Sequence, residues 1–286
     1  MKGIESLQMA IDFIESRLME PVTVEQIAKQ AKMSPFHFQR TFAVMTGVTV
    51  GEYIRRRRLT LAAYELLRAN IKIVDLAAKY GYDSPEAFAK AFRRQHGLPP
   101  SEAKARGTLV AYNRLTIQVN VGGTEPLNVR MVEREAFQAV GIWRKISLEN
   151  GASEERIPAL WDEVNASGLC DRLFQLNNGK LTGVLGIGIT DPERDAGLMM
   201  DYWVAAEYVG PPPEDLKRIE VPSFRWAVFG VTGPLPYAFR RTWKQIYGEW
   251  FPSVGYTQAG PVELEFYPDH HPAAPDHYAE IWIPVM

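Results

Sequence analysis

The sequence predicts two domains: an all-α N-terminal domain and an α+β C-terminal domain with an antiparallel sheet. Three observations predict this arrangement. A serine-capped helix pattern at residue 34 returns 50 positions later, a second pattern is duplicated within the C-terminal half, and the charge changes sign between the two parts. Residues 1–107 carry 17 Lys and Arg against 11 Asp and Glu, and the remainder carries 15 against 23. A basic part joined to an acidic part is typical of a polyanion-binding module fused to a second module.

Length and composition are ordinary for a globular protein. The 286 residues suffice for two domains with separate cores. Cys170 is the only cysteine, so no internal disulfide can form and a reducing compartment is expected. No stretch approaches the ~20 apolar residues of a membrane span, and acidic residues interrupt the first apolar-periodic segment, unlike a signal peptide. We therefore expect a cytoplasmic protein without a membrane partner.

The first predicted elements are helices. Apolar residues recur at helical spacing over about Gly3–Met19, and a short helix follows over Val24–Ala31. Ser34 can cap the next helix, whose Phe38 and Phe42 share one face. A short helix, a tight turn and a second helix form a helix-turn-helix, whose second helix enters the major groove of DNA.

The second helix of this motif carries two side chains suited to reading bases. Gln39 and Arg40 are expected to turn toward solvent, away from the phenylalanine face. Both side chain types make bidentate hydrogen bonds with base edges, Gln with adenine and Arg with guanine. A plain surface role is the alternative, but their place near the start of a capped and repeated helix favours base contact.

A long helix over about Val50–Ala69 joins this motif to its repeat. At ~20 residues it is ~30 Å long, close to the ~34–36 Å between successive major-groove faces on one side of DNA. The repeat follows as a short helix over Ile73–Tyr80 and a second capped helix over Ser84–His96. Four arginines in the middle of the long helix either contact phosphates or form a solvated face. They are Arg55, Arg56, Arg57 and Arg58.

Residues 1–107 resemble the DNA-binding domain of the AraC/XylS family. The resemblance rests on the Ser34–Phe42 helix, on Gly51–Arg55, on Ala77–Tyr82 and on the run His96–Ser101. It implies two helix-turn-helix units joined by one long helix, with double-stranded DNA as the partner. We expect a monomer to bind an asymmetric promoter site, with RNA polymerase as a further partner.

The resemblance also places the candidate DNA contacts by position. Groove contacts fall on Phe36, Gln39 and Arg40 in the first unit, and on Pro85, Glu86, Ala87, Ala89 and Lys90 in the second. Three readings of the second unit stay open: contact with thymine methyl groups, contact with cytosine through Glu86, or contact mostly with phosphates through Lys90, Arg93 and Arg94. Three of the second-unit positions are proline or alanine, whose side chains donate no hydrogen bonds. Sequence specificity is therefore expected mainly in the first unit.

The C-terminal part is duplicated. A connecting segment over residues 108–125 precedes it and includes an expected strand over Leu109–Val121. Each half opens on a strand and continues with a helix that carries a tryptophan, Trp161 in the first half and Trp243 in the second. The following strands are Leu181–Ile189 and Met199–Tyr208, and then Pro261–Tyr267 and His277–Val285. A duplicated β-α-β-β unit predicts an antiparallel sheet with helices on one side and a ligand groove between the halves.

The last expected strand carries a pattern typical of a cation site. Tyr278, Glu280 and Trp282 alternate along one face, and the aliphatic residues between them should pack on the helices. A carboxylate between two aromatic rings suits a flat, lipophilic cation. The alternative is a surface carboxylate flanked by half-buried aromatics. Further candidates for the ligand site are Asp201, Tyr202, Trp203, Glu265, Trp161 and Trp143, the aromatic ones having a core role as their alternative.

Residues 126–286 resemble the GyrI-like small-molecule-binding domain. The resemblance rests on Val140-Gly141, Trp250–Pro252, Gly260–Tyr267 and Ala279–Pro284. It implies a bound effector whose positive charge pairs with an acidic pocket residue, Glu280 being the first candidate and Glu265 the second. An AraC-type domain over residues 1–107 followed by a GyrI-like domain is the arrangement of the Rob-type regulators.

The sequence therefore predicts a DNA-binding transcriptional regulator with a small lipophilic effector, a cation being the favoured class. Two alternatives stay open for the C-terminal domain: a hydrolase in which Glu280 activates water, and a protein-interaction module. No cofactor is predicted, because no glycine-rich phosphate loop precedes a helix. No metal is predicted either, because His270, His271 and His277 match no ligand spacing.

Overall fold

The computed structural model describes residues 2–69, 71–117, 126–148, 152–191, 199–269 and 274–286. The chain forms two compact units. The first comprises Met1–Pro35 and Thr49–Asn120, and the second comprises Phe36–Val48 and Val121–Met286. Among the helices of the described residues, none is long and apolar enough to cross a bilayer.

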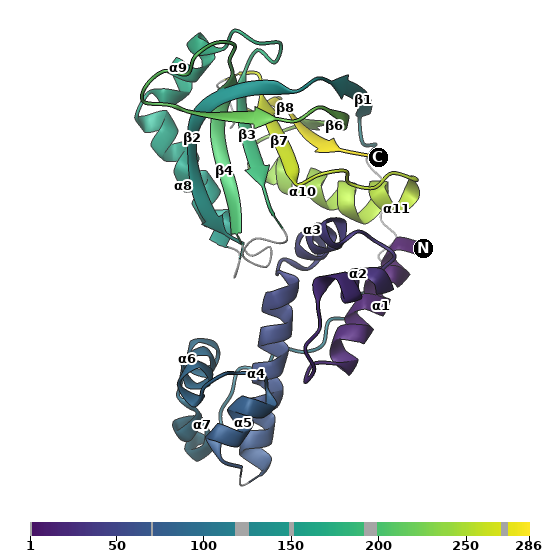
Figure 1. Ribbon diagram of the computed structural model, residues 1–286, viewed down its shortest axis with the longest axis vertical. Helices are drawn as coiled ribbons and strands as arrows, with labels where there is room; N and C mark the ends of the chain where they lie inside the picture. The colour runs from purple at the N-terminus through teal and green to yellow at the C-terminus, as the bar shows by residue number, and fades with distance from the viewer. Residues whose placement is uncertain (1, 70, 118–125, 149–151, 192–198, 270–273) are drawn as a thin grey trace. The chain divides into compact units, whose positions relative to one another are not determined.

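The first unit is helical, as the sequence predicts. Its helices are α1 (Lys2–Ser16), α2 (Val24–Gln30), α4 (Val50–Arg68), α5 (Ile73–Lys79), α6 (Pro85–His96) and α7 (Pro100–Arg106). Figure 1 shows α1 and α2 at one end of the long α4, and α5 to α7 at the other. Phe88 and Phe92 of α6 are fully buried in a core with Leu59 and Leu66 of α4. The second helix-turn-helix unit therefore rests on the long helix.

Local signals set the ends of these helices. Thr23 and Gln26 form a reciprocal capping box at the start of α2. The Ser84 hydroxyl accepts the Ala87 N–H at the start of α6, which ends at Gly97 with φ of 77°. Such a left-handed residue favours glycine, so the serine and the glycine delimit α6 as predicted.

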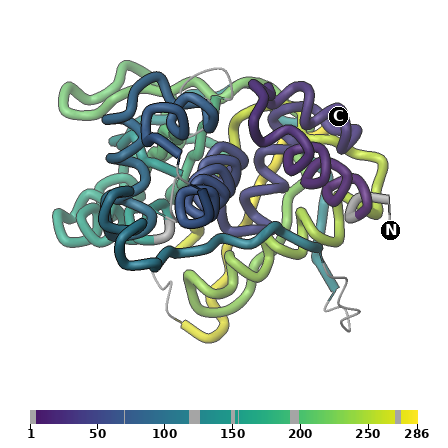
Figure 2. Tube along the Cα trace, turned by 90° about the horizontal axis from the view of Figure 1, so that it is seen from below, coloured from purple at the N-terminus to yellow at the C-terminus, as the bar shows by residue number. Residues whose placement is uncertain are grey.

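The strand expected over Leu109–Val121 is not formed in residues 108–117. Side chains of the helices bind the backbone of this segment instead, where a neighbouring strand would otherwise do so. The Tyr112 N–H donates to Thr60 Oγ1 at 3.1 Å, and the Leu115 N–H donates to the Tyr53 hydroxyl at 3.2 Å. In Figure 2 the segment runs from the end of α7 toward α1. The rest of the expected connection, residues 118–125, lies outside the described residues.

The second unit contains an antiparallel eight-stranded sheet in the order β1-β6-β8-β7-β3-β4-β2-β5. The strands are β1 (Val129–Arg134), β2 (Phe137–Ser147), β3 (Val184–Ile189), β4 (Met199–Glu207), β5 (Lys217–Val221), β6 (Phe224–Thr232), β7 (Val262–Tyr267) and β8 (Tyr278–Pro284). Outward from the centre, β7-β8-β6-β1 repeats the arrangement β3-β4-β2-β5. This symmetry confirms the predicted duplication, to which each half adds one outer strand.

Helices cover one face of this sheet. They are α8 (Ala152–Ala166), α9 (Leu169–Leu176), α10 (Tyr237–Gln245), the π-helical turn η3 (Ile246–Trp250) and α11 (Phe251–Ser253). Ala279, Ile281 and Ile283 of β8 share a core with residues of α10, η3 and α11, as predicted. Trp282 lies in a separate core that contains no helix residue, on the opposite face. We call these the helix face and the open face.

One N-terminal helix also belongs to the second unit. It is α3 (Pro35–Thr46), the predicted base-reading helix of the first helix-turn-helix unit. Val44 packs against the core beneath α10, and the His37 ring lies 4.7 Å from the Phe251 ring, edge to face. Figure 1 shows α3 beside α10 and α11.

Candidate functional site

A half-buried carboxylate lies on the helix face at the meeting of the two halves. Glu265 of β7 accepts hydrogen bonds on Oε2 from the hydroxyls of Tyr202 at 2.8 Å and Tyr267 at 3.0 Å. The Trp161 indole N–H donates to the Tyr202 hydroxyl at 3.0 Å, and its ring lies 4.6 Å from that of Tyr267. Trp243 lies near enough to lower the pKa of the Glu265 carboxyl. The carboxylate is thus enclosed by two phenols and two indoles.

The sheet register and the duplication bring this cluster together. Gly186 of β3 pairs with Glu265 of β7, so the two central strands meet at the site. A Cβ at Gly186 would lie only 2.3 Å from the Tyr202 hydroxyl oxygen and 3.1 Å from Glu265 Oε2. The absence of a side chain at Gly186 therefore leaves room for the hydrogen bond between Tyr202 and Glu265. Each repeated helix contributes one tryptophan, Trp161 from α8 and Trp243 from α10.

The surroundings control the protonation of these groups. Burial raises the pKa of the Glu265 carboxyl above its ordinary value, while hydrogen bonds from Tyr202 and Tyr267 act in the opposite direction. Burial and the Glu265 charge raise the pKa of both tyrosines well above 10, so their hydroxyls remain donors. A desolvated carboxylate walled by aromatic rings is suited to bind an organic cation.

A second carboxylate, Glu263, lies two positions earlier on the same face and holds Arg40 of α3. Arg40 Nε donates to Glu263 Oε1 at 2.8 Å, and its terminal nitrogen lies 2.7 Å from Oε2. The Arg40 guanidinium carbon lies 4.5 Å from the centre of the Trp243 ring. Burial alone would lower the pKa of Arg40, but the charges and hydrogen bonds of Glu263 and Tyr247 together outweigh this and raise it. The expectation that Arg40 turns toward solvent is wrong: its side chain is only 21% exposed.

The predicted cation site around Glu280 lies on the open face. Tyr278 and Trp282 donate to the Glu280 carboxylate at 2.7 and 2.8 Å, so the expected alternation is correct. Arg130 of β1 forms a fork with the same carboxylate, at 2.8 and 2.9 Å. Glu280 is therefore already neutralised by a cation of this chain, and its carboxylate is 6% exposed.

The remaining ligand-site candidates divide between the two faces. Tyr202, Trp161 and Glu265 gather on the helix face, as described above. Trp203 lies with the open-face core, and the Trp143 ring stacks on it with ring centres 5.9 Å apart. Asp201, two positions before Trp203 on the same strand, shares that open face.

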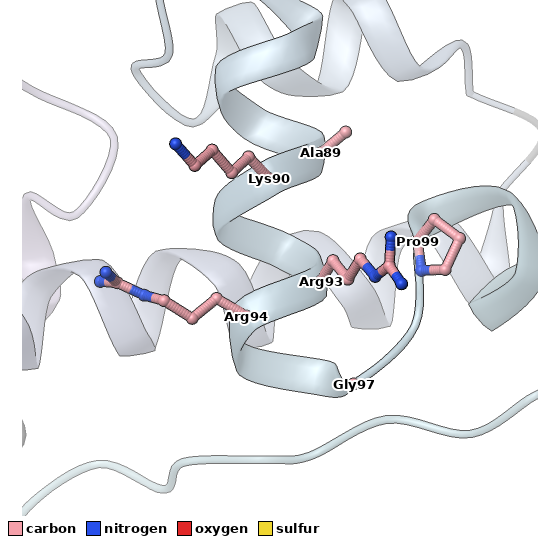
Figure 3. A pocket seen from close by; sticks show the side chains of 6 residues that line it. All are labelled: Ala89, Lys90, Arg93, Arg94, Gly97 and Pro99. Carbon is pink, nitrogen blue, oxygen red and sulfur yellow. The ribbon is translucent and has the colours of Figure 1, made fainter.

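The second DNA-reading helix, α6, presents a basic surface. Its exposed predicted residues are Glu86, Ala87, Lys90, Arg93 and Arg94, while Pro85 and Ala89 are half-buried. Figure 3 shows Lys90 and Arg94 extending to one side of α6, and Arg93 extending toward Pro99. A shallow hollow lies among Ala89, Lys90, Arg93, Arg94, Gly97 and Pro99. These side chains are suited to contact DNA phosphates.

The arginine run of α4 is bound within its own unit, so the solvated-face alternative is wrong. Arg56 pairs with Glu52, and Arg57 forms a fork with Glu15 at 2.7 and 2.8 Å. Arg58 donates to the carbonyl oxygens of Leu18 and Glu20. Arg55 is half-buried. The guanidinium groups of Arg57 and Arg58 thus hold helices and loops of the first unit together, and the pair of Arg56 with Glu52 lies within α4.

The two other predicted contacts of α3 are also partly covered. Phe36 and Gln39 are both half-buried. The Gln39 Oε1 atom is buried and accepts no hydrogen bond from the described residues. Of the three histidines weighed for a metal, His270 and His271 lie outside the described residues, and His277 Nδ1 lies 3.1 Å from Asp269 Oδ1.

Several residues of the site escaped the sequence reasoning. Glu263, Trp243, Tyr247, Gly186 and Arg130 were not among the expected site residues, and Tyr267 was weighed as pocket lining with a core role favoured. Trp243 occupies in the second repeat the place of Trp161 in the first, so the duplication itself carried a signal. Glu263 and Glu265 alternate with apolar residues on one strand, which places both carboxylates on one face. Nothing local indicates Arg130, because it lies 150 positions from Glu280.

Two family models match the chain. The helix-turn-helix domain model matches residues 27–106, and the model of the integron-associated effector binding proteins matches residues 130–285. The chain is similar to the HTH-type transcriptional activator AarP of Providencia stuartii, with 38% identity over 105 residues that cover 37% of this chain and 76% of AarP. It is also similar to the regulatory protein SoxS of Salmonella typhimurium, with 38% identity over 35% of this chain and 94% of SoxS. Among solved structures, an integron cassette protein of Vibrio cholerae matches 55% of this chain and 95% of its own, with 21% identity and a TM-score of 0.38.

Proposed function

Because the chain belongs to the DNA-binding AraC-type transcriptional regulators and carries an integron-associated, GyrI-like effector-binding domain, we propose that its effector is a lipophilic organic cation. The cation binds on the helix face of the sheet, between the two halves. Its positive charge pairs with Glu265, and its rings pack against Trp161 and Trp243.

The observation that carries this proposal is the enclosure of Glu265. Its carboxylate is half-buried and partly desolvated, and its hydrogen bonds come from the neutral hydroxyls of Tyr202 and Tyr267. Neutral donors stabilise the charge without cancelling it, so the carboxylate retains its attraction for a cation. Glu280 is less suited to this role, because the fork from Arg130 already neutralises it.

On the DNA side, α6 supplies phosphate contacts through Lys90, Arg93 and Arg94, and Arg40 of α3 supplies base contact. The exposure and charge of the α6 side chains support the first part. Arg40→Ala should cost about 1–3 kcal/mol on the specific site and relax the preference at one base pair. Lys90→Ala should weaken binding to all sequences alike and reduce the salt dependence by about one phosphate contact.

The effector proposal is tested by calorimetric titration of the full chain with benzyltriphenylphosphonium and with the neutral triphenylphosphine oxide. We expect the cation to bind, and Glu265→Gln to weaken that binding by about 10–100-fold because a charged partner is lost. Binding of the neutral compound should not change. Glu280→Gln is the matched comparison on the opposite face and should leave the cation affinity unaltered. If Glu280→Gln weakens cation binding and Glu265→Gln does not, the effector binds at Glu280 instead.

In this proposal the domain binds its ligand without converting it. Recovery of the unchanged compound after prolonged incubation supports a binding role, whereas turnover that Glu265→Gln abolishes would establish a hydrolase instead. A domain that saturates with neither compound would favour a protein-interaction module.

A further inference from the structure

One face of α3 is built to lie against the helix face of the second unit. Val44 packs against the core beneath α10, and His37 packs edge to face on Phe251. The Met45 sulfur lies 3.1 Å from the position of a Cβ at Gly248, so this glycine of η3 leaves room for the methionine. Residues 37, 40 and 44 share one face of a helix, which places Arg40 at the centre of this contact.

Arg40 meets a preformed guanidinium site at that centre. Glu263 is 7% exposed, and its Oε1 also accepts the Tyr247 hydroxyl at 2.8 Å and Gln258 Nε2 at 3.1 Å. These bonds fix the carboxylate so that both oxygens face the Arg40 fork. The Trp243 ring covers the guanidinium at 4.5 Å, and Tyr247 lies 5.7 Å away. The site therefore recognises a flat cation with two parallel N–H donors.

We propose, resting on the proposed function, that Glu263, Trp243 and Tyr247 form a second cation subsite specific for aromatic amidinium and guanidinium groups, and that Arg40 fills it as an internal ligand. An effector of this class pairs its fork with Glu263 and stacks its ring on Trp243. It thereby displaces Arg40, and the same guanidinium becomes free to bind a base.

Trp243 links this subsite to the Glu265 site. Its ring covers Arg40, and its indole also lies near enough to Glu265 to lower the pKa of that carboxyl. Because β-strand residues two apart lie ~7 Å from each other, an effector with two cationic groups can span both carboxylates. The two subsites differ in the ligands that they select. Glu265 accepts hydrogen bonds from neutral hydroxyls and suits any lipophilic cation, whereas the Glu263 subsite requires a cation with two parallel N–H donors.

The internal-ligand role predicts that removing Arg40 improves effector binding. Since Arg40 competes for Glu263, the Arg40→Ala full chain should bind benzamidine at least about tenfold more tightly than the unaltered chain. Benzamide, which has the same shape without the charge, should bind neither protein. Arg40→Lys should give an intermediate affinity, because lysine keeps the charge but lacks the fork. Binding is measured by calorimetric titration, with thermal unfolding as a check on the fold.

Controls separate this inference from the proposed function. Arg144→Ala removes a half-exposed arginine paired with Glu163 in the same unit and should not change benzamidine affinity. Adding Glu263→Gln to Arg40→Ala should abolish the gain, whereas benzyltriphenylphosphonium should still bind at Glu265. Equal benzamidine affinities with and without Arg40 would overturn the internal-ligand role. If the unaltered chain does not bind benzyltriphenylphosphonium, the effector proposal is overturned instead.

Discussion

At the scale of single residues, Glu265 determines how effector binding depends on pH. Burial raises the pKa of its carboxyl above 4.5, even though the tyrosine hydrogen bonds oppose the shift. A cation pairs with the ionised form alone. The affinity for benzyltriphenylphosphonium, whose charge does not titrate, should therefore be full above the raised pKa and fall as the pH drops through it. We expect the half-point of this fall above pH 4.5, measured by calorimetry between about pH 4 and 8. The Glu265→Gln variant should bind weakly and without this dependence; a curve that persists there would implicate another group.

Gly186 offers a steric test of the same site. In Gly186→Ala the new Cβ would collide with the Tyr202 hydroxyl and crowd Glu265, so the bond between them must break. We expect the cation affinity to fall about tenfold, the equivalent of one hydrogen bond to a charged group. Gly188→Ala is the matched control on the same strand and face, because its nearest neighbour is the flexible Met200 side chain at 3.3 Å. Similar losses in both variants would mean that the strand, rather than the Glu265 cluster, is disturbed.

The site residues could be predicted from sequence only in part. Alternation along β8 placed Tyr278, Glu280 and Trp282 on one face, and the structure brings them together. Alternation does not say which face of a sheet lies beneath the helices. It also cannot show that Arg130, from a distant strand, neutralises Glu280. The choice between Glu280 and Glu265 depends on these long-range contacts.

At the scale of elements, Arg57 joins α4, α1 and the segment after α7. Its guanidinium forms a fork with Glu15 and donates to the Tyr112 carbonyl oxygen at 2.6 Å. Both side chains of the ion pair are nearly buried, at 12% and 11% exposure. Arg57→Ala should therefore lower the free energy of unfolding by about 1–3 kcal/mol, measured by urea denaturation. The exposed pair of Arg106 with Glu102 is the control, and Arg106→Ala should change stability by less than about 0.5 kcal/mol.

Elements whose signals are local could be predicted well. Ser84 and Gly97 bound α6 through a cap and a left-handed residue, and both features are readable in sequence. The expected strand over Leu109–Val121 is not formed in its described part, residues 109–117, for a physical reason. The N–H groups of Leu115 and Ile117 do donate hydrogen bonds, as they would in a strand. Their acceptors, however, are the Tyr53 hydroxyl at 3.2 Å and the Gln8 amide oxygen at 2.9 Å, which belong to side chains. Side-chain acceptors can thus take the hydrogen bonds that a neighbouring strand would accept. The alternation of apolar and polar residues in the sequence is the same in both cases.

At the scale of the whole molecule, the duplication predicts the topology of the second unit, because two equivalent β-α-β-β segments must pair about a central axis. The membership of α3 in that unit was not predictable. It depends on the bond between Arg40 and Glu263, which lie 223 positions apart, and on the space that Gly248 leaves for Met45. A helix-turn-helix pattern specifies the reading helix but not what that helix contacts in the absence of DNA.

This contact predicts the sign of the coupling between effector and DNA. Arg40 cannot form its fork with Glu263 and with a guanine at the same time, so an amidinium effector should increase sequence-specific binding. Selection of duplexes from a random library by the full chain should enrich a preferred site several-fold more strongly with benzamidine than with benzamide. By reciprocity, that duplex should raise benzamidine affinity by the same factor.

The salt dependence of DNA binding should stay constant, because Lys90, Arg93 and Arg94 of α6 keep their phosphate contacts. Arg40→Ala should show weak enrichment with either compound. Enrichment that falls with benzamidine would mean that the Glu263 contact belongs to the DNA-bound form.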